Sequence, residues 1–306
     1  MSLHVITGAG STGGRTALLL AAAGERVRLI SRRGLGPEHP LIERVAGDTA
    51  DADRLTELTA GARTLINCSA PPYDRWRTEF PPMATSLLTT AERTGANYVS
   101  LSNVYGYGSV GGPLTEDLPM TPRAVKGAVR ARMWLDALAA HEAGRARVTE
   151  VRAADFLGRD AVSLYNLLVT PKVVAGAPAA YPGDPEVLKS WSYLDDVALT
   201  LATVARDDRS WGRAWHVPST HMSLRELTIR LAKVANVPEP RLSAMTPVEL
   251  AWAGAEDAIA AEVVEMYYSL EHPAILDSTR TESTFGLSAT PIDTVLADTA
   301  RFSAPA

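Results

Sequence analysis

Short apolar runs alternate with longer amphipathic stretches along the first half of the sequence. The apolar runs have the length of β-strands and are predicted at 3–7, 25–30, 44–48, 64–70, 97–102 and 147–158. The stretches between them have the length and periodicity of helices and are predicted at about 11–23, 51–60, 77–93 and 123–141. Strands and helices in alternation are typical of a doubly wound parallel sheet, so the sequence predicts an α/β fold of the Rossmann type.

The pattern becomes less regular after residue 158. The second half is predicted to contain a short helix at 163–168, a helix that begins at Trp191, a strand at 211–217 and helical stretches at 223–235, 247–270 and 293–302. Proline and glycine are frequent between these stretches, and no repeat or low-complexity linker separates them. We therefore predict a sheet domain at 1–158 and a smaller, mostly helical lobe at 159–306, interleaved with the end of the sheet.

Three glycines at the first strand-to-helix junction have the spacing G-x-G-x-x-G. Gly8 permits the sharp turn off the strand, Gly10 lets a pyrophosphate approach the backbone, and Gly13 lets the helix pack close to the strand. Ser11 and Thr12 lie in the first helical turn, whose free N–H groups favour phosphate. A purely structural turn is the alternative, but the flanking strand and helix favour a dinucleotide site.

Two arginines follow the second predicted strand. At this position, about twenty residues past the glycines, an acidic residue binds the ribose 2′-hydroxyl of NAD, whereas arginine accommodates the 2′-phosphate of NADP. Arg32 and Arg33 stand here without an acidic residue, and guanidinium pairs well with phosphate. The sequence therefore predicts NADP(H) as the cofactor, and a pair of solvated loop arginines is the alternative.

Further candidate residues follow the third and fourth predicted strands. Asp48 either contacts the adenine end of the dinucleotide or caps the next helix, and both roles stay open. Ser69 and Ala70 are small, which leaves room for a ligand beside the switch point of the sheet. Tyr73 and Trp76 either line a substrate pocket or cap the helix that runs to about residue 93.

Composition and charge argue against several classes of protein, among them nucleic-acid-binding and metal-binding proteins. The net charge of −5 and the lack of a basic run argue against a nucleic-acid surface. Cys68 is the only cysteine, so an internal disulfide and a thiolate metal cluster are excluded, and the histidine spacing predicts no metal site. The sequence contains no apolar span of about 18 residues and no signal-like start, so we expect a cytoplasmic protein without a membrane partner.

By these features the sequence resembles the extended short-chain dehydrogenase/reductase superfamily, which includes the sugar-nucleotide epimerases and dehydratases. The resemblance rests on residues 7–13, Asp48, 67–70, 104–106, Arg152 with Gly158, and 193–198. The glycine positions look like those of its atypical branch, which includes reductases, isomerases and NmrA-like sensors that bind the dinucleotide without chemistry. The resemblance implies a Rossmann fold and a nicotinamide dinucleotide cofactor.

The tyrosine of the superfamily's catalytic pair is missing. The resemblance implies Tyr-x-x-x-Lys in the helix after the fifth strand, with tyrosine protonating a carbonyl and lysine holding the nicotinamide ribose. The helix predicted at 123–141 contains no tyrosine. Lys126-x-x-x-Arg130 occupies the motif if Arg130 takes the lysine position, whereas Pro122 falls at the tyrosine position if Lys126 is the motif lysine.

Basic residues on this helix are the first candidates for the missing chemistry. Arg123, Lys126 and Arg130 are three and four residues apart, so they share one helix face. This face is either a solvated basic stripe or a set of donors for the cofactor ribose and a developing alkoxide. Lys126 can donate a proton, whereas Arg130 can only donate hydrogen bonds.

The end of the fifth strand supplies further candidates. The family's serine position falls on Leu101, and Ser102 follows one residue later. Tyr105 is the tyrosine expected to replace the missing acid, with a packed loop aromatic as the alternative. Ser102, Lys126 and Tyr105 are thus the candidate catalytic residues. The expected substrate-binding residues are Tyr73, Trp76, Asn103, Tyr107 and Trp191.

Together these features predict an NADP(H)-dependent ketoreductase of the atypical short-chain type that acts on a small-molecule ketone. The aromatic side chains and an alanine- and arginine-rich composition suggest an aromatic polyketide or another natural product as substrate. We expect a monomer or homodimer. A non-catalytic NmrA-like dinucleotide sensor is the first alternative, because it does not need the tyrosine. A sugar-nucleotide epimerase or dehydratase ranks behind it, because both need the Tyr–Lys pair.

Overall fold

In a computed structural model, which describes residues 1–255 and 258–302, the chain forms two compact units. The first unit comprises Met1–Gly106, Pro119–Arg152 and Val197–His216. The second unit comprises Tyr107–Leu118, Ala153–Asp196 and Val217–Ala306. Each unit is thus assembled from stretches that are far apart in sequence, and residue 158, the predicted domain boundary, falls inside the second unit.

The first unit is organised around a seven-stranded parallel sheet with the order β10-β6-β5-β4-β1-β2-β3. Its strands are β1 (Leu3–Thr7), β2 (Arg26–Ser31), β3 (Ile42–Ala46), β4 (Thr64–Asn67), β5 (Asn97–Asn103), β6 (Val148–Ala153) and β10 (Arg213–His216). The chain runs outward from β1 to β3 and then returns to β4 on the other side of β1. This confirms the predicted doubly wound sheet and places the switch point between the carboxyl ends of β1 and β4.

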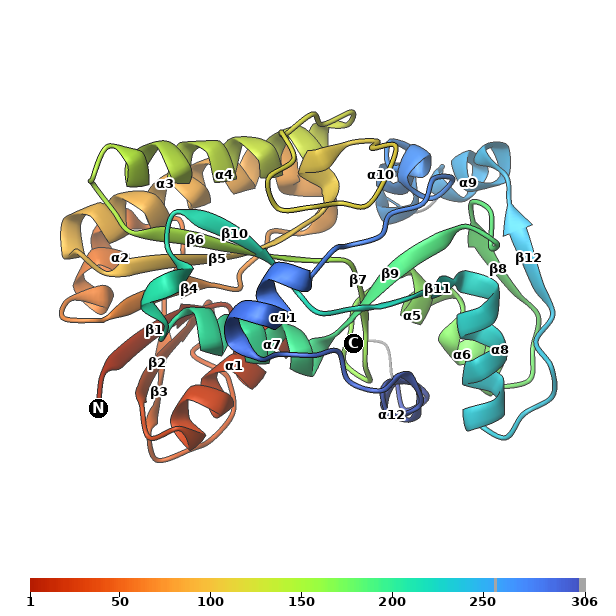
Figure 1. The fold of residues 1–306 in the computed structure, drawn as a ribbon, viewed down its shortest axis with the longest axis horizontal. Coiled ribbons are helices and arrows are strands. Elements are labelled where there is room, and N and C mark those ends of the chain that lie inside the picture. The colour runs from red at the N-terminus through yellow and green to blue at the C-terminus, as the bar shows by residue number, and fades with distance from the viewer. Residues whose placement is uncertain (256–257, 303–306) are drawn as a thin grey trace. The chain divides into compact units, whose positions relative to one another are not determined.

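Helices cover both faces of this sheet (Figure 1). Those helices are α1 (Ser11–Ala22) on one face and α2 (Ala52–Thr59), α3 (Trp76–Thr94) and α4 (Val125–Glu142) on the other. Because both faces are covered, β1 and β4 are buried over most of their length. The core beneath α3 and α4 is rich in aromatic residues, namely Trp76, Phe80, Tyr98 and Trp134.

The second unit combines two small sheets with short helices. Its strands are β7 (Asp155–Leu157), β9 (Leu188–Tyr193) and β11 (Thr220–Ser223) in one sheet, and β8 (Ala179–Pro182) with β12 (Leu242–Met245) in the other. Its helices are α5 (Leu164–Leu168), α6 (Thr170–Val174), α8 (Leu224–Val234), α9 (Pro247–Gly254), α10 (Ala258–Val264), α11 (Thr279–Phe285) and α12 (Ile292–Thr299). No helix among the described residues is both long and apolar enough to cross a membrane.

Two predicted helix starts were wrong. Trp191 belongs to strand β9, where its backbone pairs with both neighbouring strands, and α7 (Leu194–Val204) begins only after that strand. Helix α4 begins at Val125 and not near Arg123, because the preceding backbone turns back: the Thr121 N–H donates to the Gly106 carbonyl at 3.0 Å. Thr121 therefore ties this loop to the turn that follows β5.

Other predictions about the second half hold in part. The stretch at 247–270 contains the two helices α9 and α10, and its residues 256–257 lie outside the described ones. The helical stretch predicted at 223–235 forms α8, and Ser223 caps its start, because its hydroxyl accepts a hydrogen bond from the Glu226 N–H at 3.1 Å.

Candidate functional site

The glycine turn lies at the switch point, and its three glycines serve different needs. Gly8 has φ +88°, and a β-carbon there would stand 2.7 Å from the Cys68 carbonyl carbon. A β-carbon on Gly13 would overlap the carbonyl oxygen of Gly8. A β-carbon on Gly10, in contrast, would meet nothing within 4 Å. The fold itself requires Gly8 and Gly13, whereas Gly10 leaves open space beside the backbone.

The N-terminus of α1 has the features of an anion-binding site. Gly10 is the N-cap and provides no side-chain hydrogen bond to the helix, and the first turn contains no acidic residue. Ser11 and Thr12 are the first two helical residues, and Thr12 is buried. Unsatisfied N–H groups at the positive end of a helix dipole favour a phosphate group. Open space at Gly10 and free donors at Ser11 and Thr12 together fit a dinucleotide pyrophosphate.

The predicted 2′-phosphate ligands lie next to this turn. The Gly8 N–H donates to the Ile30 carbonyl at 2.8 Å, so the glycine turn contacts the end of β2 directly. Arg32 and Arg33 follow in a tight turn closed by the Gly34 N–H on the Ser31 carbonyl. Both arginines are exposed, and their side chains make no hydrogen bond or ion pair with any residue that the structure describes.

Asp48 does not cap a helix, so that alternative was wrong. Its carboxylate accepts a hydrogen bond from the Ala50 N–H at 2.9 Å and forms a turn after β3. The N-cap of α2 is Asp51, whose carboxylate accepts from the Arg54 N–H at 3.0 Å. Asp48 is exposed at the same edge of the sheet as the glycine turn.

A buried amide that the sequence reasoning did not select organises the loop after β4. The Asn67 carbonyl oxygen accepts from the Thr7 hydroxyl at 2.9 Å and from the Ser69 N–H at 3.0 Å. The Ser69 hydroxyl lies 3.3 Å from that of Thr49, and Ala70 is exposed. Asn67 therefore joins β1 to the loop that carries Ser69. In the sequence, Asn67 could have been identified as a polar residue at the end of a predicted buried strand.

The basic residues at the start of α4 differ in burial. Arg123 precedes the helix and is exposed, whereas Lys126 and Arg130 are 2% and 8% exposed. The solvated stripe was therefore wrong for these two residues. The Lys126 ammonium lies 4.5 Å from the centroid of the Tyr73 ring. The two buried cations share one face of α4, which points into the aromatic core.

The Arg130 guanidinium contacts two aromatic rings and a backbone carbonyl. Its guanidinium carbon lies 4.6 Å from the Trp76 ring centroid and 4.4 Å from that of Phe80, and one N–H donates to the Leu101 carbonyl at 3.3 Å. Burial lowers the pKa of Arg130 to about 10, and the carboxylate of Glu150 opposes this shift. Arg130 therefore remains a cation at neutral pH.

The end of β5 brings the remaining first-unit candidates close to α4. Ser102 is 4% exposed in the strand. The Asn103 side chain accepts from the Tyr105 N–H at 3.1 Å and shapes the turn that follows. A β-carbon on Gly127 would stand 2.5 Å from the Tyr105 carbonyl oxygen, so Gly127 lets α4 pack directly on this turn. Lys126 precedes Gly127 and is thereby brought to the end of β5.

Two predicted substrate residues belong to the second unit. Tyr107 is fully buried. Trp191 is 2% exposed, its indole N–H donates to the Met222 carbonyl at 3.0 Å, and its ring meets that of Tyr165 edge-on at 5.4 Å. These contacts give Trp191 a packing role within the core of its unit.

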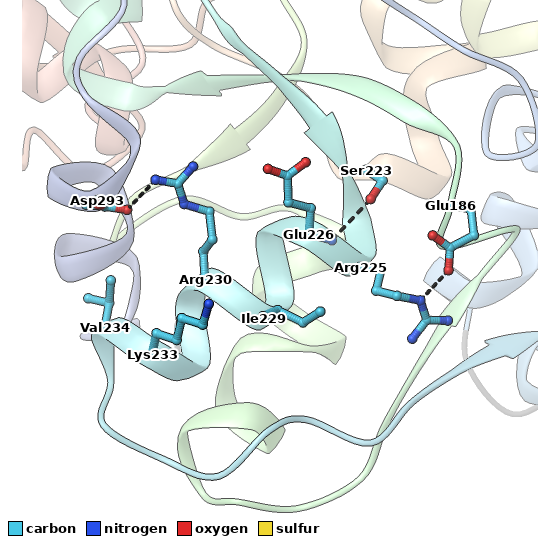
Figure 2. A pocket seen from close by; sticks show the side chains of 9 residues that line it. All are labelled: Glu186, Ser223, Arg225, Glu226, Ile229, Arg230, Lys233, Val234 and Asp293. Atoms are coloured by element: carbon cyan, nitrogen blue, oxygen red, sulfur yellow. Dashed lines mark hydrogen bonds and ion pairs between the residues drawn. The ribbon is translucent and has the colours of Figure 1, made fainter.

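The second unit also has a surface pocket of about 670 Å³ along helix α8 (Figure 2). Its walls are tied by an ion pair between Arg225 and Glu186 and by a second one at 3.0 Å between Arg230 and Asp293. None of the predicted site residues is among the described residues that line it. Two of its cations are thus already paired with acidic residues.

Comparison with known protein families gives one match. Residues 4–217 match the model of the NAD dependent epimerase/dehydratase family. No curated protein shows a significant match to the sequence.

Solved structures with the same fold cover nearly the whole chain. The Bordetella bronchiseptica enzyme WbmH in complex with NAD+ has 20% identity and a TM-score of 0.75, over 99% of this chain and 98% of that one. DesIV, a dTDP-glucose 4,6-dehydratase from Streptomyces venezuelae with NAD and TYD bound, has 20% identity and a TM-score of 0.77 over 98% and 96%. The epimerase Mth375 from Methanothermobacter thermautotrophicus has 15% identity and a TM-score of 0.81 over 98% and 91%.

At these identities the neighbours show a shared fold. The family match fits the epimerase or dehydratase alternative better than a ketoreductase that acts on polyketides. The glycine turn at the switch point is the place where such a fold takes a nicotinamide dinucleotide. Since the family model matches well over half of the sequence, the chain belongs to the NAD dependent epimerase/dehydratase family.

Proposed function

We propose that this protein binds NADP(H) and catalyses hydride transfer between the nicotinamide and a carbon that carries a hydroxyl or carbonyl group in a small-molecule substrate. The observation that carries the proposal is the open space at Gly10, where the fold has no need of a glycine. Free N–H groups at the start of α1 supply the complementary donors. When bound, NADP(H) supplies or accepts the hydride.

Lys126 is proposed to take the place of the missing tyrosine. Reduction of a carbonyl leaves negative charge on its oxygen, and a preorganised cation stabilises that charge in a site from which water is excluded. Lys126 is 2% exposed and adjoins the end of β5, where Ser102 and Tyr105 lie. Its ammonium gives a proton to the forming alkoxide, and in the oxidative direction the neutral amine takes a proton from the hydroxyl. Ser102 is proposed to donate a hydrogen bond to the same oxygen.

Arg130 is proposed to act as a fixed charge and not as the ribose ligand. Its guanidinium packs against both Trp76 and Phe80 and donates a hydrogen bond to the Leu101 carbonyl. A side chain held in this way contributes a constant positive potential near the end of β5.

The proposal includes a preference for NADP(H) over NAD(H). Arg32 and Arg33 support it, because both side chains are exposed beside the glycine turn and neither is paired with a carboxylate of the described residues. The end of β2 contains no acidic residue that would accept the ribose 2′-hydroxyl of NAD. WbmH and DesIV have NAD bound, so cofactor choice is a point on which this chain is proposed to differ from them.

The substrate class is the open part of the proposal. The family match supports a sugar-nucleotide epimerase or dehydratase, and Lys126 could remove and return protons in either reaction. The rings of Tyr73 and Trp76 suggested an aromatic polyketide, but they face the cations of α4 and so lend that substrate little support. A sensor that only binds the dinucleotide does not need a buried lysine at this position.

Two measurements test the proposal, namely net NADPH oxidation or NADP+ reduction and analysis of the products, because an epimerase or dehydratase returns the hydride to its substrate and leaves no net change in the cofactor. The substrates are a set of nucleotide-diphosphate sugars and their keto forms, together with a set of aromatic ketones. Turnover of any one of them is the expected result. Tight NADPH binding with no turnover across both sets would favour the sensor, and failure to bind either dinucleotide would refute the proposal as a whole.

A further inference from the structure

Three aromatic side chains form a stripe at the start of α3. Tyr73 lies in a 3₁₀ turn just before the helix, Trp76 is its first residue, and Phe80 follows one turn later. The Tyr73 and Trp76 rings meet edge-on at 5.1 Å, and those of Trp76 and Phe80 at 5.0 Å. The Trp76 indole N–H donates to the Pro71 carbonyl at 3.2 Å, which fixes the stripe to the loop after β4. The three rings are thus held in one arrangement.

The two buried cations of α4 lie opposite this stripe. The Lys126 ammonium is 4.5 Å from the Tyr73 centroid, and the Arg130 guanidinium carbon is 4.6 Å from the Trp76 centroid and 4.4 Å from that of Phe80. All three distances between a cation and a ring centroid are within the range of a cation–π interaction, which strengthens when the cation is removed from water. The ring spacing on α3 therefore matches the four-residue spacing of the cations on α4.

Rings contact both cations of α4. Arg130 contacts two rings and a backbone carbonyl, so its position is set from several sides. The Lys126 ammonium faces the ring of Tyr73, which is half-buried. The lysine stem is flexible, and a single ring face can select one of its rotamers.

We propose that Tyr73 is a positioning residue, whose ring face holds the Lys126 ammonium at the end of β5, where the substrate oxygen reacts. The proposal rests on the function given above for Lys126. It also assigns Tyr73 a role that differs from lining a substrate pocket. Because the ring face and not the phenol hydroxyl makes the contact, phenylalanine should replace Tyr73 and an aliphatic side chain should not.

Lysine NMR tests this contact without any substrate. The sequence contains only four lysines, Lys126, Lys172, Lys189 and Lys233, so a protein labelled with [¹³Cε]lysine gives four assignable signals. The Lys126 Hε signal is expected to be shifted upfield by the ring current, relative to the exposed Lys172 and Lys233. The shift should persist in Tyr73→Phe and disappear in Tyr73→Met. An unshifted Lys126 signal in the wild type would overturn the proposal without any variant.

Kinetics test whether the contact positions the lysine for reaction. In Tyr73→Met, kcat should fall about 3-fold to 30-fold, the range expected for the loss of one cation–π contact. The Kd for NADPH should change less than about twofold, and Tyr73→Phe should restore most of kcat. Phe80→Leu is the matched control, because it removes a ring of the same stripe beside Arg130 and should leave the Lys126 signal in place.

The two assays separate this proposal from the proposed function. An unchanged kcat in Tyr73→Met, with the Lys126 signal shifted as before, would overturn the positioning role of Tyr73. If the wild type turns over no substrate, hydride transfer is refuted, and the NMR signal still decides whether the ring holds the lysine.

Discussion

Gly13 of helix α1 is packed so closely on Gly8 that a β-carbon on Gly13 would overlap the Gly8 carbonyl oxygen. The first turn of the helix is thereby held against the glycine turn. Gly13→Ala is therefore expected to lower the free energy of unfolding by about 1–3 kcal/mol, the usual cost of overpacking a buried site. Urea unfolding measures this loss, and an alanine variant as stable as the wild type would contradict the packing.

Gly10→Val should abolish dinucleotide binding and leave the free energy of unfolding nearly unchanged. Its backbone has φ −70°, which any residue can adopt, and its β-carbon would lie in open space. The variant should therefore fold with nearly normal stability and fail to bind a dinucleotide, because the side chain occupies the space left for the pyrophosphate. Calorimetry that shows normal NADPH binding by a folded Gly10→Val would reduce the motif to a structural turn.

Cofactor choice should depend on the two exposed arginines. Loss of a charge-assisted hydrogen bond costs about 1.5–3 kcal/mol, which is roughly tenfold or more in affinity. Replacing both Arg32 and Arg33 with alanine should raise the Kd for NADPH by at least that factor and leave the Kd for NADH nearly unchanged. Arg44→Ala is a control on the neighbouring strand β3. Equal weakening of both cofactors, or a wild-type preference for NADH, would refute the assignment.

The sequence predicted the sheet well because its signals are local. Strands such as 3–7 and 97–102 are short segments rich in aliphatic and aromatic residues that lie next to glycines, and the glycine spacing marks the switch point by itself. The strand containing Trp191 was harder to recognise. Asp195 and Asp196 follow it, and acidic residues are typical of a first helical turn, so the predicted helix began too early. Only pairing with β7 and β11 makes Trp191 a strand residue.

The candidate site was less predictable because its chemistry depends on tertiary contacts. Lys126 and Arg130 have the spacing of a surface stripe, and burial of two cations is rare without compensating partners. The compensation comes from rings about 50 residues earlier in the chain, at Tyr73, Trp76 and Phe80. Neither helix by itself shows that this pairing exists.

A buried histidine should make the fold sensitive to acid. His4 in β1 is fully buried, its Nδ1 lies 2.6 Å from the Thr64 hydroxyl, and burial lowers its pKa to about 4. An unfolded histidine has a pKa near about 6.5. Between these values the unfolded state binds a proton and the folded state does not, so stability falls as the pH is lowered from about 6.5 to 4, by up to about 3 kcal/mol.

Urea unfolding at pH 7 and at about pH 4.5 measures this effect. His4→Gln should reduce the pH dependence, whereas His272→Gln, at an exposed position, should leave it unchanged. If the two variants have the same pH dependence as the wild type, His4 is not the titrating group.

Substitution of Lys126 tests the central claim most directly. Lys126→Met keeps most of the apolar stem against the Tyr73 ring and removes the ammonium. Because the alkoxide charge exists only toward the transition state, kcat should fall by about 10²–10³, as for loss of one oxyanion donor. The Kd for NADPH, measured by calorimetry on the same samples, should stay within about twofold. A Lys126→Met protein with a near-normal kcat, or one that loses NADPH binding and kcat in equal measure, would contradict the assignment of Lys126 to the reacting oxygen.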